Sequence, residues 1–136
     1  MVLHDHEGAI IFYACPALQH CQDATEAELL AIEEGICLSL HWSPLNFIVE
    51  SDCAEAVNLI RASTPNTSAF AFRINIIRKL IRERDINLVK ISREANTVSH
   101  ELARLGRVQG RTEFWLGSTP PDPSEVVALD CHLVVA

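Results

Sequence analysis

Several features that mark other classes of protein are missing from this 136-residue sequence. No apolar run approaches the roughly 18 residues that span a bilayer. The first residues contain neither the basic region nor the apolar core of a signal peptide. The five cysteines are odd in number and form no CxxC pair, which argues against a disulfide framework or a zinc site. We therefore expect a cytoplasmic or nuclear protein with reduced thiols that is neither secreted nor inserted in a membrane.

Motifs that bind phosphate or perform acyl transfer are also missing. The sequence has no P-loop, no GxGxxG and no serine in a nucleophile elbow. It also has no H-x3-H pair, which would place two histidines on one face of a helix. These absences leave nucleotide-binding, acyl-transfer and histidine-based metal sites without support.

Lysine and arginine are absent from residues 1–60, which contain ten acidic residues. Residues 61–111 contain all eleven basic residues and only four acidic ones. The net charge of −7 argues against nucleic-acid binding, but this asymmetry predicts an acidic cluster beside a basic face. An acidic cluster can hold divalent cations, and a basic face can follow a phosphate backbone. The alternative is two solvated faces of opposite sign.

The length and an apolar fraction of 49% fit one domain with a single core. Hydrophobic periodicity and turn residues indicate a mixed order of strands and helices, which predicts an α+β domain. The expected elements are a hairpin (Val2–Asp5 and Ala9–Ala14, turning at Gly8), a helix from Asp23 to Leu40, a strand at Asn46–Glu50, helices at Cys53–Ala62 and Ala69–Arg84, a strand at Ile86–Ile91 and a helix at Asn96–Leu105 capped by Gly106.

The stretch Asn46–Asp52 contains the first candidate site residue. Phe47–Val49 is typical of a strand that is buried on both faces, as in a parallel sheet. Asp52 follows that strand, and ligands of open α/β sheets bind at the carboxyl ends of strands. A structural interpretation is also open, because Asp52 is a good N-cap for the next helix and Glu55 completes a capping box.

Glu28 is the second candidate. In the predicted helix it lies about 40° from Ile32 and therefore on the apolar side, away from most other acids of that helix. A carboxylate that faces the core is costly unless it meets a cation, a metal or hydrogen-bond donors. The alternative is an edge position from which Glu28 reaches water. His100, near the start of the last predicted helix, is by itself more typical of a surface residue than of a ligand.

Four stretches, taken in order, are similar to those of one family: Leu3–Gly8, Glu26–Ala31, Val49–Val57 and Ile91–Arg104. With the order of elements, they resemble the ribonuclease H type 1 domain, in particular the plant RNase H-like domains of retrotransposon-derived proteins. The resemblance covers about residues 1–106, and residues 107–136 correspond to a variable C-terminal tail. It implies a ribonuclease H-like fold, in which helices flank a mixed β-sheet.

The resemblance also implies a nuclease that cuts the RNA strand of an RNA–DNA hybrid. In that family four carboxylates hold two Mg²⁺ ions, one activating water and the other easing departure of the leaving oxygen. Carried over by position, Glu28 and Asp52 are metal ligands and catalytic residues. His100 stands at the position of the family's last Asp.

The chain departs from the family at its first strand, which is central in the sheet and carries the leading Asp. That strand has no counterpart here. Imidazole suits Mg²⁺ poorly, so with two of four carboxylates we expect weak or absent Mg²⁺ binding. The missing strand leaves two strand edges unpaired. Three outcomes are open: the hairpin closes directly onto Asn46–Glu50, the apolar segment Glu125–Ala136 fills the slot, or a truncated product folds poorly.

Two functions follow from the resemblance. The first is nucleic-acid binding with hybrid-specific ribonuclease activity. The second is a non-catalytic nucleic-acid-binding or protein-interaction module that has lost its metals. For either nucleic-acid function, we expect phosphate contacts from six basic residues: Arg73, Arg78, Lys79, Arg82, Lys90 and Arg93.

Overall fold

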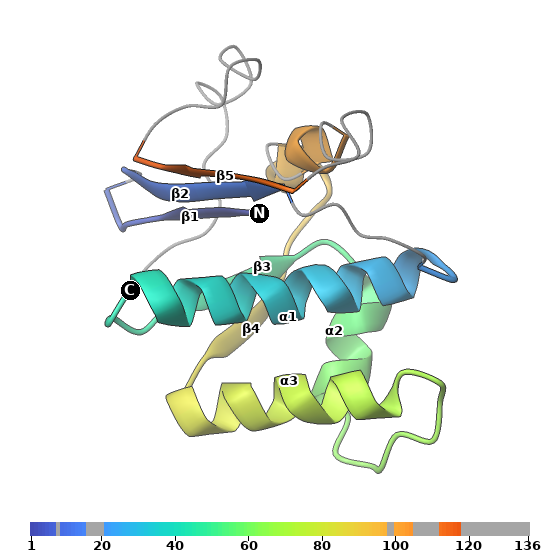
Figure 1. The fold of residues 1–136 in the computed structure, drawn as a ribbon. Helices are drawn as coiled ribbons and strands as arrows, with labels where there is room; N and C mark the ends of the chain where they lie inside the picture. The colour runs from blue at the N-terminus through green and yellow to red at the C-terminus, as the bar shows by residue number, and fades with distance from the viewer. Residues whose placement is uncertain (8, 16–20, 98–99, 105–111, 118–136) are drawn as a thin grey trace.

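The computed structural model describes residues 1–7, 9–15, 21–97, 100–104 and 112–117 (Figure 1). The predicted turn at Gly8, the predicted cap at Gly106 and the segment Glu125–Ala136 lie outside these ranges. Along the part of the chain that is described, no helix combines the length and the apolar character needed to cross a bilayer.

A three-stranded antiparallel sheet contains the two ends of the described chain. Strands β1 (Val2–His4) and β2 (Ile10–Cys15) form the predicted hairpin, and β5 (Glu113–Leu116) pairs with the other edge of β2. The sequence did not predict β5, because only an isolated apolar pair, Trp115-Leu116, marks it. Its Phe114 ring packs 5.2 Å from the ring of Phe12, so the contact with β2 stabilises a strand with little local signal of its own.

Strands β3 (Ile48–Ser51) and β4 (Asn87–Lys90) form a separate parallel pair, as predicted for strands joined by helices. The ladder continues to Ile91, whose backbone N–H donates to the carbonyl of Ser51 at 3.0 Å. Val49 and Ser51 are buried, whereas Ile48 and Glu50 are only half-buried. The predicted burial of β3 on both faces is therefore found only in part.

The two sheets are not hydrogen-bonded to one another within the described ranges, where the strand orders are β1-β2-β5 and β3-β4. The hairpin therefore does not close directly onto the strand after Asn46, which corrects the first of the three expected outcomes. Among the described residues, β1 pairs with β2, and β3 pairs with β4.

Three helices connect these strands: α1 (Ala24–Trp42), α2 (Ala54–Arg61) and α3 (Ala71–Arg84). Each lies within a few residues of its predicted range. Asp23 caps α1 as predicted, accepting a hydrogen bond from the Glu26 backbone N–H at 2.9 Å. The Glu26 carboxylate accepts from the backbone N–H of Gln22 at 2.6 Å, one residue before the cap. The last predicted helix begins instead as a 3-10 turn (Glu94–Asn96), followed by helical residues at 97 and 100–104.

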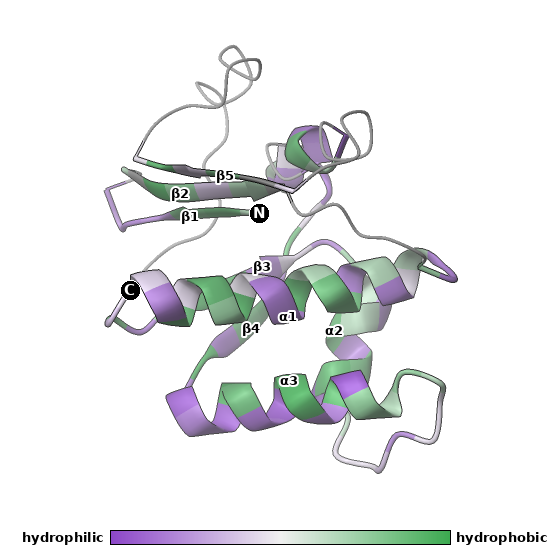
Figure 2. Ribbon diagram, viewed as in Figure 1, coloured by the Kyte–Doolittle hydropathy of each residue, from purple (hydrophilic) through white to green (hydrophobic). Residues whose placement is uncertain are grey.

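A single hydrophobic core joins the two sheets. Leu29 and Ile36 of α1 share it with Leu3 and Phe12 of the hairpin and with Ile77 of α3, and all five are buried. In Figure 1, α1 lies between the three-stranded sheet and α3, and it crosses β3 and β4. Figure 2 shows hydrophobic colouring along the hairpin strands and hydrophilic colouring at the C-terminal end of α3. The architecture is therefore α+β, as predicted.

Candidate functional site

Asp52 lies between the end of β3 and the start of α2, but it does not cap that helix. The N-cap is Cys53, whose sulfur accepts from the backbone N–H of Ala56 at 3.5 Å. The backbone N–H of Cys53 itself donates to the Ser51 hydroxyl oxygen at 3.1 Å. The interpretation of Asp52 as a helix cap is therefore wrong, because the chain enters the helix one residue later and leaves the Asp52 carboxylate for other partners.

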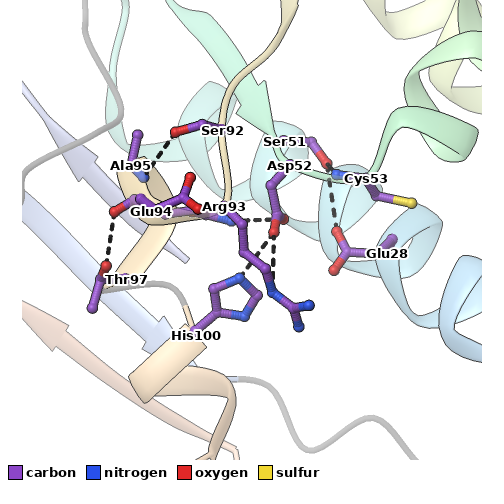
Figure 3. A network of polar contacts seen from close by, with 11 residues as sticks. Glu28, Ser51, Asp52, Cys53, Ser92, Arg93, Glu94, Ala95, Thr97 and His100 are labelled. Atoms are coloured by element: carbon purple, nitrogen blue, oxygen red, sulfur yellow. Dashed lines mark hydrogen bonds and ion pairs between the residues drawn. The ribbon is translucent and has the colours of Figure 1, made fainter.

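Those partners come from the segment that follows β4. The side-chain amide of Asn96 donates to Oδ1 of Asp52 at 3.0 Å. Nε2 of His100 lies 2.9 Å from Oδ2, and since a carboxylate only accepts, this nitrogen is the one that donates. The Nε atom of Arg93 lies 3.9 Å from the same oxygen. Figure 3 shows the carboxylate pointing toward His100 and Arg93, and its side chain is only 9% exposed.

Glu28 reaches the same place from α1. Its Oε2 atom accepts a hydrogen bond from the Ser51 hydroxyl at 3.5 Å, and the residue is half-buried (Figure 3). The inward orientation expected from helical spacing is therefore present, with a donor to meet the carboxylate. Ser51 lies between the two acids in this arrangement, since it contacts Glu28 and immediately precedes Asp52.

The pKa values of the two carboxyl groups are shifted in opposite directions. Burial raises the pKa of Glu28, and the nearby charge of Asp52 raises it further, against smaller opposing effects from His100 and Ser51. Burial alone would raise the pKa of Asp52, but hydrogen bonds from Asn96 and His100 outweigh it and the pKa is lowered. Asp52 is thus held as the anion of the pair, while Glu28 retains its proton to a higher pH than usual.

The six basic residues expected to contact phosphate fall into separate groups. Arg73 forms an ion pair with Glu33, which ties α3 to α1. Arg78 donates to the carbonyl oxygens of three residues at and beyond the end of α2. Both guanidinium groups thus have partners within the protein. Exposed positions are held by the other four: Lys79 and Arg82 on α3, Lys90 at the end of β4 and Arg93 beside Asp52.

Two residues of the site were not predicted, Ser51 and Asn96. Strand alternation could have placed the Ser51 side chain on the buried face with Val49. Asn96 precedes His100 by four residues, a spacing that brings side chains to one face of a helix. Neither signal identifies a partner, because Ser51 contacts Glu28, 23 residues earlier in the chain, and Asn96 contacts Asp52, 44 residues earlier.

The donor set does not fit a two-metal centre. Mg²⁺ prefers octahedral coordination by oxygen atoms. Here both Asp52 oxygens accept from N–H donors, and the Arg93 cation lies beside one of them. No group of three or more histidine, cysteine, aspartate or glutamate side chains that could hold a metal ion is found where residues are described.

Comparison with known proteins identifies the family. A family model described as reverse transcriptase-like, which represents an RNase H-like domain, matches residues 1–106. No curated protein and no solved structure matches the chain significantly. The matched range includes the hairpin, all three long helices, the parallel strands and every residue of the site described above. The chain therefore belongs to the reverse transcriptase-like family of RNase H-like domains.

Proposed function

We propose that this chain is a nucleic-acid-binding domain of the RNase H type, with an RNA–DNA hybrid as its ligand. The observation that supports the proposal is the convergence of Glu28, Asp52 and His100 at the carboxyl end of β3, although 24 residues separate the first two. Ligands of α/β sheets bind at this edge. The family match over residues 1–106 supports a nucleic-acid-related function.

Hydrolysis of the RNA strand is the reaction that the family resemblance implies. When bound in a complete site, Mg²⁺ would supply the activated water and stabilise the leaving oxygen. Glu28 and Asp52 stand at the positions of two of the family's four ligands. Two carboxylates and an imidazole do not make that site, so we propose hybrid binding without efficient cleavage as the activity of this chain.

The exposed basic residues nearest the site support phosphate contacts there. Lys90 ends β4, and the Arg93 side chain is 80% exposed beside Asp52. Lys79 and Arg82 lie on α3, which Figure 1 shows on the other side of α1 from the helical residues 94–97 and 100–104. The geometry therefore favours Lys90 and Arg93 over the α3 pair as the first phosphate contacts.

Fluorescence anisotropy with a labelled hybrid tests this proposal. We expect affinity to fall steeply with salt, with a log–log slope that decreases by about 0.9 for each phosphate contact removed. The double variant Lys90→Gln/Arg93→Gln should lose affinity and slope, whereas Lys79→Gln/Arg82→Gln makes the same charge change and should lose less. Affinity that is independent of salt, or an equal loss in both variants, would contradict the proposed interface.

A gain-of-function experiment tests the family reaction. Adding an upstream strand that carries an Asp, together with His100→Asp, supplies the two carboxylates that the family has and this chain lacks. We expect this protein to cleave a hybrid in the presence of Mg²⁺, and EDTA to stop the reaction. A folded protein of this design with no cleavage would remove the nuclease interpretation while leaving binding intact.

A non-catalytic protein-interaction module is the second candidate. An exposed aromatic pair favours it, because the rings of Trp42 and Phe114 stack at 5.6 Å on the surface beside the exposed Leu116. A folded protein without affinity for hybrid or duplex nucleic acid would favour this candidate. For either function we propose the cytoplasm or nucleus, which the free thiols of Cys21, Cys37 and Cys53 support.

A further inference from the structure

The Asp52 carboxylate is engaged on both oxygens by residues of a single segment. Asn96 donates to Oδ1 at 3.0 Å. His100 donates to Oδ2 at 2.9 Å, and Arg93 places a positive charge 3.9 Å from the same oxygen (Figure 3). All three residues follow β4, whereas Asp52 follows β3. The carboxylate therefore joins two parts of the chain that meet only in the tertiary structure.

This arrangement is the reverse of what a metal ligand needs. A carboxylate that binds Mg²⁺ offers lone pairs at about 2.0–2.1 Å to the ion. At Asp52 the N–H groups of Asn96 and His100 take one acceptor position on each oxygen, and Arg93 places a positive charge beside Oδ2. A metal ion that bound this carboxylate would compete with these hydrogen bonds, and the Arg93 guanidinium group would repel it.

The same contacts fasten the helical residues after β4. Asn96 and His100 are four residues apart, and the side chains of both contact Asp52. Leu102, further along the chain, is fully buried. The carboxylate thus holds the polar side of a segment whose apolar side is packed inside the protein.

We propose that Asp52 is the centre of a metal-independent clasp, in which Asn96, His100 and Arg93 take the place of a divalent cation and hold residues 93–97 and 100–104 at the carboxyl end of β3. In this protein the clasp positions that segment whether or not nucleic acid or Mg²⁺ is present. The inference goes beyond hybrid binding and does not depend on it.

The sign of a stability change distinguishes a clasp from a metal centre. In a metal centre without metal the carboxylates repel one another, so Asp52→Asn would raise Tm. In the clasp the same change removes the charge that Asn96, His100 and Arg93 hold, so we expect Tm to fall by about 3–8 °C. Glu28→Gln is the matched control, because it makes the same acid-to-amide change at the neighbouring carboxyl group and should leave Tm unchanged or raised.

A second measurement uses the unmodified protein and Mg²⁺ alone. The ring nitrogen signals of His100, followed by NMR at constant pH and ionic strength, should stay in place as MgCl₂ is added to 10 mM, and Tm should not rise. In Asp52→Asn those ring signals should move. A rise in Tm for Asp52→Asn, or a Mg²⁺-dependent shift of the His100 signals in the unmodified protein, would overturn the clasp. Neither result depends on whether a hybrid binds.

Discussion

Replacing Arg78 tests whether its side chain stabilises the fold or contacts nucleic acid. The guanidinium group donates to the carbonyl oxygens of Leu59, Ile60 and Thr64 at 2.8, 2.9 and 3.3 Å. Carbonyl groups at the end of a helix have no partner within the helix, so Arg78 satisfies the end of α2 from α3. A hydrogen bond to a charged group contributes about 1.5–3 kcal/mol, and such contributions are not additive. Because the side chain is only half-buried and water can replace part of the loss, we expect Arg78→Gln to reduce the free energy of unfolding by about 2–4 kcal/mol.

Urea denaturation followed by circular dichroism measures this change. Lys79→Gln is the control, because Lys79 is the next residue and is 69% exposed, so its replacement should change the free energy by no more than about 0.5 kcal/mol. Arg78→Lys keeps the charge but cannot make the same set of bonds, so it should recover little of the loss. Equal stability of Arg78→Gln and Lys79→Gln would refute the structural role of Arg78. A loss of affinity for the hybrid in such a stable Arg78→Gln variant would identify Arg78 as a nucleic-acid contact instead.

Three further predictions concern charge and helix stability. The raised pKa of Glu28 means that its protonated form favours the folded state. This contribution to stability is present below about pH 4.5 and is lost as pH rises through the pKa of the folded state. Glu28→Gln should therefore flatten the fall in stability between pH 4 and pH 7, measured by urea titration. The lowered pKa of Asp52 has the opposite sign, so the cost of Asp52→Asn should shrink as pH falls below about 3.8. Gly35→Ala should stabilise α1 by about 0.5–1 kcal/mol. Within 4 Å the added Cβ would meet the Met1 side chain, whose Sδ lies 3.2 Å away and can move aside. A loss of stability would show that Met1 cannot move.

Local signals in the sequence determined most of the fold. The spacing of Ile74 and Ile77 predicts the buried side of α3, and Asp23 marks the start of α1. The hairpin and the β3-β4 pair are also predicted from the sequence, because alternating or continuous apolar runs bounded by turn residues indicate strands without information about distant residues. Helical spacing identifies Glu28 as a candidate, and the end of a predicted strand identifies Asp52, without reference to any contact between their elements.

Tertiary structure alone decided what those charged residues contact. Nothing near Asp52 in the sequence indicates that Cys53 caps α2 and leaves the carboxylate to His100 and Asn96. Nothing near Arg78 indicates that its guanidinium group meets the end of α2. Strand β5 likewise depends on β2, with which it pairs about 100 residues away. The reason is physical: hydrophobic period and caps are properties of neighbours in the chain, whereas a charge or a short strand takes its role from whichever distant group the folded core brings beside it.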